Sequence, residues 1–333
     1  MEYKFGIYGG SFNPLHLGHL ECIIKASGIC EKLLIIISST KNVDEIDVRV
    51  RYRWIYQLTK HIGNVSIYIL EDNTTSKAEY SEENWFSDSK KIKEYVKQKI
   101  DVVFCGSDYD ENSFWAKCYP ESKLYIFPRN EISSTIIRTN VFEHWNMIPN
   151  IVKEYFTKKV LIIGSESTGK SVLAQNLANY FCTQYLEEVG RDISELSGSE
   201  DFMLSQDFTR ILLEHKLKEM NLIKYCNKIL IEDTDCLITK FFIDFLKDKE
   251  KDKNSALALA ISQINSYDLI LFLEPDVKFY LDGRTKEIAN NRKFVSESIK
   301  KIYKDCGFKF IEISGSYNER FNKACKAIKN ILN

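Results

Sequence analysis

Two glycines and two histidines near the N-terminus are spaced for phosphate chemistry. The glycines of Gly9-Gly10-Ser11-Phe12 permit a tight turn and let the backbone approach a phosphate closely. A helix that begins near His16 would present its first N–H groups and its positive dipole end to the same anion. His16 and His19 are three residues apart, so they share one face of the first helical turn. We expect their imidazoles to stabilise negative charge that develops on a leaving phosphate group.

Other side chains in the first half could complete a nucleotide site. Ser134, Thr135 and Arg138 place two hydroxyls and one guanidinium at an expected helix start, which suits a triphosphate. The alternative is a serine or threonine helix cap beside a surface arginine. Trp54 and Trp85 lie between the two motifs, and either indole could form the wall of a binding pocket. Either tryptophan could instead belong to the core, and we favour Trp85 because its sequence surroundings are polar and loop-like.

The second half opens with a complete phosphate-loop motif, G-x-x-x-x-G-K-[ST], between an expected strand and an expected helix. Its N–H groups would surround a β-phosphate, the lysine would reach the β/γ oxygens, and the last serine would hold Mg²⁺. The motif consists of Gly164, Ser165, Glu166, Ser167, Thr168, Gly169, Lys170 and Ser171.

Two carboxylates and two arginines downstream could assist phosphoryl transfer. Asp233 and Asp235 follow an expected strand, where catalytic groups of parallel sheets collect. One could support Mg²⁺ and one could accept the proton of an attacking hydroxyl, although a solvated turn is the alternative. Arg284 and Arg292 lie in a polar segment that we expect to act as a lid over the phosphoryl group. The alternative for both is a plain surface arginine.

The elements that must position these residues alternate between apolar strands and amphipathic helices, which predicts an α/β protein with two doubly wound parallel sheets. We expect a Rossmann-like domain at residues 1–157 and a P-loop domain at 158–333, and the family resemblance given below implies that they are a nucleotidyltransferase and a kinase, respectively. Helices are expected around 89–98, 151–156 and 202–220. The expected strands are residues 4–8, 33–38, 65–70, 102–105, 124–127, 160–163, 229–232, 269–273 and 310–313.

Composition narrows the function classes. A net charge of −1 in 333 residues excludes a broadly basic nucleic-acid coat, so we expect no nucleic-acid partner. The longest aliphatic run, residues 33–37, is too short to span a membrane, and the N-terminus has no signal-peptide pattern. Nine cysteines without a Cys-x-x-Cys pair are typical of reduced thiols, so we expect a cytoplasmic protein without a zinc site.

The motifs resemble known families. The segment from Gly9 to His19 resembles the GxFxPxHxGH signature of the nucleotidyltransferase superfamily, and residues 132–138 resemble its ISSTxxR element. The segments around Trp54 and Trp85 are similar to those that line the mononucleotide pocket of nicotinamide mononucleotide (NMN) adenylyltransferases. The order of the two sites resembles the NadR family, in which an NMN adenylyltransferase is fused to a ribosylnicotinamide kinase.

Further matches to that family are Glu188-Val189-Gly190-Arg191-Asp192, which implies a nucleotide or substrate contact for Arg191, and residues 313–321. There are two departures. Arg284 stands one position earlier than in the family's DGxR lid, and Asp192 replaces a glutamate. Because the first expected strand begins at residue 4, we expect the chain to lack the helix-turn-helix domain that repressor members carry.

The resemblance implies a bifunctional enzyme of NAD salvage. One domain would phosphorylate nicotinamide riboside with ATP and Mg²⁺, using Lys170, Ser171 and Asp233 or Asp235. The other would adenylylate NMN with a second ATP and release pyrophosphate, using His16, His19 and Arg138. The alternative is a regulator that senses pyridine nucleotides with little turnover. A preference for nicotinic acid forms and a homo-oligomeric assembly both remain compatible with the sequence.

Overall fold

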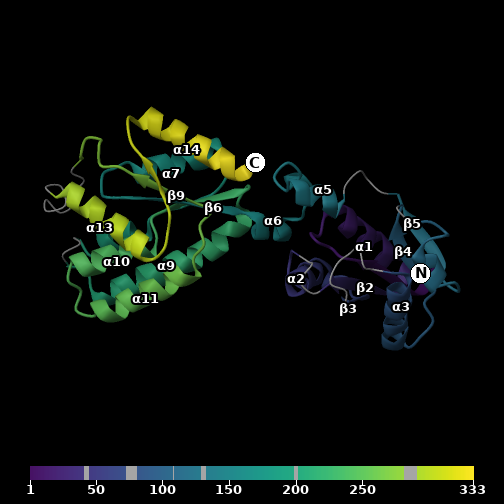
Figure 1. The fold of residues 1–333 in the computed structure, drawn as a ribbon. Helices are drawn as coiled ribbons and strands as arrows, with labels where there is room; N and C mark the ends of the chain where they lie inside the picture. The colour runs from purple at the N-terminus through teal and green to yellow at the C-terminus, as the bar shows by residue number, and fades with distance from the viewer. Residues whose placement is uncertain (41–44, 73–80, 108, 129–132, 199–201, 281–290) are drawn as a thin grey trace. The chain divides into compact units, whose positions relative to one another are not determined.

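The computed structural model describes residues 1–333 except 41–44, 73–80, 108, 129–132, 199–201 and 281–290. The chain forms two compact units, Met1–Val152 and Lys153–Asn333 (Figure 1). The division falls inside helix α6 (Asn150–Phe156), which leads into the first strand of the second unit. Each unit contains a five-stranded parallel sheet with helices on its faces, so the expected α/β fold class is confirmed.

In unit 1 the sheet has the strand order β3-β2-β1-β4-β5. Strand β1 pairs with β2 on one side and with β4 on the other, so the chain reverses its direction of winding at β1. Ligands of doubly wound sheets bind at such a reversal, outside the carboxyl ends of the strands. The five strands are β1 (Tyr3–Gly10), β2 (Cys30–Thr40), β3 (Val65–Asp72), β4 (Val102–Gly106) and β5 (Lys123–Phe127).

Helices cover both faces of this sheet because parallel strands need crossover connections. Helices α3 (Glu82–Val96) and α4 (Phe114–Cys118) bury the apolar side chains of one face, including Ile7, Leu34 and Val103. Helices α1 (Leu17–Ile29) and α2 (Val48–Thr59) contact β2. The short helices α5 (Ser134–Thr139) and η2 (Trp145–Met147) complete the unit.

In unit 2 the strand order is β10-β9-β6-β8-β7, with the phosphate-loop strand β6 in the centre. Strand β7 is not among the expected strands, because a two-residue edge strand has no detectable alternation. The strands are β6 (Lys158–Gly164), β7 (Tyr185–Leu186), β8 (Ile229–Asp233), β9 (Leu269–Leu273) and β10 (Ile311–Ile313).

The helices of unit 2 form two layers (Figure 1). Helices α7 (Lys170–Tyr180) and α14 (Tyr317–Leu332) pack on one face of the sheet. The other face is covered by α9 (Ser205–Leu222), α10 (Cys236–Phe245), α11 (Lys251–Ile264) and α13 (Arg292–Asp305). Helices α8 (Val189–Leu196) and η4 (Ile223–Tyr225) complete the unit. Within the described parts of the chain, no helix has the length and apolar composition to cross a membrane.

Candidate functional site

The glycine loop of unit 1 follows β1 at the reversal of winding. A Cβ atom added to Gly9 would lie 2.5 Å from the Trp115 ring, so only glycine lets the loop pass this close to α4. The guanidinium of Arg51 is fully buried and supports the loop from beneath. It donates to the carbonyl of Ser11 at 2.5 Å and to that of Ser38 at 2.9 Å, which ties the loop to the end of β2.

His16 and His19 cap the start of helix α1 reciprocally. His16 Nδ1 accepts from the backbone N–H of His19 at 3.3 Å, and His19 Nδ1 accepts from that of His16 at 3.4 Å. The two rings stack with their centroids 3.6 Å apart. Because each Nδ1 accepts a hydrogen bond, the proton of each neutral ring belongs on Nε2. The structure therefore turns both histidines into oriented N–H donors at a helix start.

The expected triphosphate ligands lie beside these histidines. Ser134, Thr135 and Arg138 line the same cavity as Gly9, Gly10, Ser11, His16 and His19. The Arg138 guanidinium donates to the carbonyl of Asn13 and, at 3.1 Å, to the Thr135 hydroxyl. Ser134 donates to the carbonyl of Pro14 at 3.0 Å. Two segments more than a hundred residues apart in sequence are thus brought together as one polar site.

Trp85 lines a second cavity, which shares Gly9, Gly10 and Ser11 with the first. The expected loop around Trp85 is a helix, α3, because Ser81 caps its first turn by accepting from the N–H of Asn84. The indole is half-buried and stacks on Phe114 with a centroid distance of 5.7 Å. The stacking on Phe114 fixes the indole of Trp85 as one wall of the cavity.

Two other expected binding residues of unit 1 lie below the surface. Trp54 is 4% exposed in α2 and is not among the described residues that line either cavity. The Phe12 ring is fully buried and meets the His19 ring edge-on at 4.9 Å. Both aromatic side chains therefore belong to the packing beneath the site. Phe12 supports the histidine that faces the cavity.

The phosphate loop of unit 2 has the backbone that its sequence predicts. Gly169 has a φ of 85°, a conformation that L side chains rarely adopt, and a Cβ there would lie 2.9 Å from the Tyr317 ring. Thr168 donates its hydroxyl hydrogen to the carbonyl of Ser165 at 2.9 Å. Lys170 Nζ donates to the same carbonyl at 3.1 Å, so the ammonium group lies over the loop.

Arg292 differs from both expectations for it, the mobile lid and the plain surface arginine. Its guanidinium donates to the carbonyls of Glu166 at 3.3 Å, Ser167 at 2.7 Å and Val277 at 2.5 Å. Arg292 is the first residue of α13, and the several N–H donors of its planar guanidinium thus support the phosphate loop from the start of that helix. Arg284, the other expected lid arginine, lies outside the described residues.

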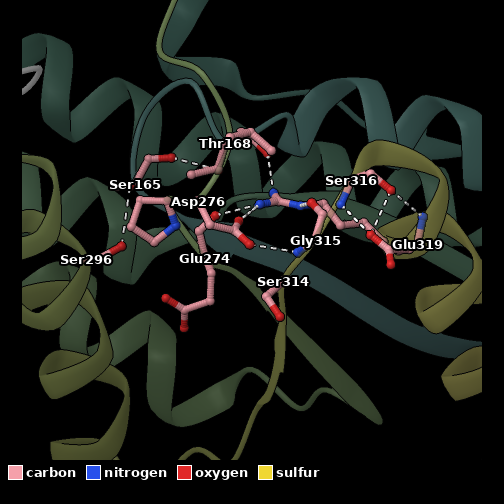
Figure 2. Close-up of polar contacts among 12 residues, drawn as sticks. Ser165, Thr168, Glu274, Asp276, Ser296, Ser314, Gly315, Ser316 and Glu319 are labelled. Carbon is pink, nitrogen blue, oxygen red and sulfur yellow. Dashed lines mark hydrogen bonds and ion pairs between the residues drawn. The ribbon is translucent and has the colours of Figure 1, made fainter.

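A second buried arginine, Arg320 of α14, supports the phosphate loop from another direction. It donates to the carbonyls of Thr168, Glu274 and Gly315, each at 2.8 Å, and forms an ion pair with Asp276. Figure 2 shows Thr168, Asp276 and Gly315 converging on this centre. The arginine joins the loop to the segments after β9 and β10. It lies within the family match at residues 313–321, where it was assigned no role.

Asp233 lies next to the phosphate loop, as expected. It is buried at the end of β8, and its Oδ1 has no hydrogen-bond partner among the described residues. Burial, reinforced by the nearby Glu188 carboxylate, raises the pKa of Asp233 to about 6, against the opposing effects of Lys170 and Ser171. Arg191 donates to the Ser171 hydroxyl at 3.0 Å and pairs with Glu188 at 3.3 Å.

The side chain of Asp235 is engaged elsewhere, contrary to the expectation that Asp235 could bind Mg²⁺ or accept the hydroxyl proton. Its Oδ1 accepts from the N–H of Leu237 at 2.9 Å and from the Tyr303 hydroxyl, and its Oδ2 accepts from Tyr267 at 3.2 Å. These bonds cap helix α10 and tie it to α13. Asp235 is buried, so its carboxylate is occupied structurally.

A further cavity of unit 2 opens at Glu188, Arg191 and Thr234 and continues between α8, α9 and α10. Its polar mouth adjoins Asp233, so a hydroxyl bound there would face the phosphate loop. Glu188 was missed as a site residue because β7, which precedes it, is too short to recognise. The position of Glu188 in the family match from Glu188 to Asp192 could have identified it, but only Arg191 was assigned a role there.

Comparisons with known proteins match each unit to a different family model. Residues 7–140 match the cytidylyltransferase-like family model, and residues 159–320 match an AAA domain model. Residues of this chain are also 31% identical over 37% of its length to a phosphopantetheine adenylyltransferase of Mycoplasma capricolum, of which 98% is covered.

Longer matches span both units. The trifunctional NAD biosynthesis/regulator protein NadR of Salmonella typhimurium is 27% identical over 99% of this chain and 84% of the relative. Its counterpart in Escherichia coli is 27% identical over 98% of this chain. A crystal structure of a NadR protein in complex with NR has the same fold, with a TM-score of 0.80, 21% identity and coverage of 100% of this chain and 96% of its own. These matches run along nearly the whole length of the chain in the same order of domains, so the chain is similar to the NadR proteins throughout both units.

Proposed function

We propose that the protein makes NAD in two ATP-dependent steps. Residues 158–333 would phosphorylate nicotinamide riboside to NMN, and residues 1–157 would join NMN to the adenylyl group of a second ATP. One observation carries the proposal: a chain matched over 99% of its length by a NAD biosynthesis protein has an assembled phosphate site in each unit.

In unit 2 the acceptor's 5′-oxygen would attack the γ-phosphorus of ATP, and the bond to the β-phosphate oxygen would break to release ADP. The proton of the hydroxyl would pass to a carboxylate at the cavity mouth, Glu188 or Asp233. A pKa of about 6 leaves Asp233 mostly ionised at neutral pH and makes it a stronger base than an ordinary aspartate, which suits the transfer of that proton. Lys170 would neutralise charge on the transferring group.

Mg²⁺ fits this end of the sheet. Asp233 and Ser171 offer hard oxygen ligands, and Asp233 Oδ1 has no partner in the described part of the chain. No cluster of three or more His, Cys, Asp or Glu side chains with metal-ligand spacing occurs among the described residues. Phosphate oxygens and water would therefore complete the coordination. When bound, the ion would offset the negative charge of the phosphates.

In unit 1 a phosphate oxygen of NMN would attack the α-phosphorus of ATP, and the bond to the β-phosphate would break to release pyrophosphate. The Nε2–H donors of His16 and His19, with Arg138, would stabilise the charge on the departing group. Trp85 would form the wall for the cationic nicotinamide ring.

The test is to incubate the purified protein with ATP, Mg²⁺ and nicotinamide riboside and to identify the products by mass. We expect ADP and NMN, followed by NAD and pyrophosphate. Binding of ATP and NMN without any product would contradict the proposal and support a nucleotide sensor.

A further inference from the structure

The acceptor cavity of unit 2 has an apolar inner wall with one unusual polar side chain. His215, on α9, lines this wall and is 7% exposed. Its Nε2 has no hydrogen-bond partner among the described residues. The apolar residues around the cavity are Val189, Met203, Phe208, Ile211, Ile238, Phe242 and Leu246.

A buried acid lies next to this histidine. Glu232, on β8, is fully buried, and neither of its carboxyl oxygens has a hydrogen-bond partner in the described structure. The distance from His215 Nε2 to Glu232 Oε2 is 3.9 Å, which is too long for a hydrogen bond. Buried polar groups in native proteins are nearly always hydrogen-bonded, so a histidine that lines the cavity and the acid behind it, both without such a bond, indicate a missing partner.

We propose that His215, together with Glu232, recognises the carboxamide of the acceptor's pyridine ring. His215 is then a specificity-determining residue of the kinase, and this inference rests on the proposed riboside phosphorylation. The 5′-hydroxyl must lie at the polar mouth near Asp233, which leaves the apolar wall for the ring. The other polar side chains beyond the mouth, Ser194 and Thr239, donate to carbonyls of their own helices at 2.9 and 3.4 Å.

The chemistry of the pair matches an amide. Whichever group holds a proton, an imidazole beside a carboxyl offers both a donor and an acceptor. A carboxamide has an N–H₂ donor and a carbonyl acceptor and can satisfy both. A ring without the carboxamide leaves the buried pair unsatisfied, and a carboxylate in its place brings a second acidic group against Glu232. The cavity therefore selects a riboside whose ring carries a neutral amide.

A kinetic double cycle in the full-length protein tests this. Phosphorylation of nicotinamide riboside is compared with that of the riboside of unsubstituted pyridine, in the wild type and in His215→Leu. We expect the wild type to prefer the amide by about tenfold or more in kcat/KM, because its buried polar groups would otherwise stay unpaired. His215→Leu should lose this preference, with the change mostly in KM, and His215→Gln should restore part of it. Nicotinic acid riboside should be a poor substrate of the wild type.

The control is His61→Leu, the same substitution at an exposed histidine of unit 1, which should keep the preference. A His215→Leu protein that keeps the wild-type preference would overturn the inference, because the ring would then be recognised elsewhere. Loss of the preference in His61→Leu as well would also overturn it. A wild-type protein that phosphorylates neither riboside would instead overturn the proposed kinase function.

Discussion

Arg320→Met should destabilise unit 2 and weaken its phosphate site without affecting unit 1. The substitution keeps an apolar side chain of similar length but leaves three backbone carbonyls and Asp276 without their donor. Removing one partner of a buried ion pair costs about 3–5 kcal/mol. Because the Asp276 side chain is 40% exposed and water can solvate it, we expect the lower end, about 3 kcal/mol.

The chain offers a clean assay for this prediction. All four tryptophans, Trp54, Trp85, Trp115 and Trp145, lie in unit 1, so tryptophan fluorescence reports the unfolding of that unit alone. Far-ultraviolet circular dichroism reports both units. A loss of about 3 kcal/mol should lower the melting temperature of unit 2 by roughly 6–12 °C. The fluorescence transition should stay in place, and kinase activity should fall while adenylylation of NMN continues.

Lys323→Met is the matched control for Arg320→Met. Lys323 lies on the same helix and also donates to a backbone carbonyl, that of Ser314 at 2.9 Å, but its side chain is exposed. We expect this variant to change stability by less than about 0.5 kcal/mol, as for most surface substitutions. Equal effects of the two variants, or a shift of the fluorescence transition by Arg320→Met, would refute the role of Arg320.

Three further predictions concern single residues of the two sites. Trp85→Ala should raise the KM for NMN about thirtyfold, the factor for a desolvated cation–π contact of about 2 kcal/mol, and an unchanged KM would exclude the contact. Gly9→Ala should abolish adenylylation in a folded protein, because its methyl group would meet the Trp115 ring at 2.5 Å; steady-state assays of both activities check this. Burial raises the pKa of Asp233 to about 6, so the folded state binds this proton more tightly and stability falls as pH rises from about 4 to 6. Asp233→Asn should therefore stabilise unit 2 at pH 8 by on the order of 2 kcal/mol while abolishing kinase activity, and a variant less stable than wild type in denaturant titrations would contradict this.

The sequence predicted the parts of the molecule that depend on local patterns. Apolar runs predicted the strands that precede both glycine loops. The positions of His16, Lys170 and Asp233 in the sequence, after those loops or after an expected strand, predicted that they lie near the loops. The helix expected at 89–98 begins earlier, at Glu82, and its first turns around Trp85 were missed because the start depends on one serine cap among polar residues that are also typical of a loop.

Long-range contacts were beyond sequence reasoning. The partners of Arg320 lie up to 152 residues away, and those of Arg292 up to 126, so the sequence could not show that either arginine supports the phosphate loop. Asp235 was assigned a catalytic role because it follows the same expected strand as Asp233, yet its side chain caps a helix. Only the fold shows which of two neighbouring carboxylates faces the phosphate loop.

The central claim is that two independent sites carry out successive steps, and product profiles of Lys170→Ala and His19→Ala test it most directly. Each variant is given ATP and Mg²⁺ with either nicotinamide riboside or NMN. Lys170→Ala should lose roughly 10²–10³-fold or more in riboside phosphorylation, because a charge contact that strengthens in the transition state is removed, and should still convert NMN to NAD. His19→Ala should convert the riboside to NMN, which accumulates without becoming NAD. Loss of both activities in a folded Lys170→Ala protein would contradict the account and indicate one shared ATP site.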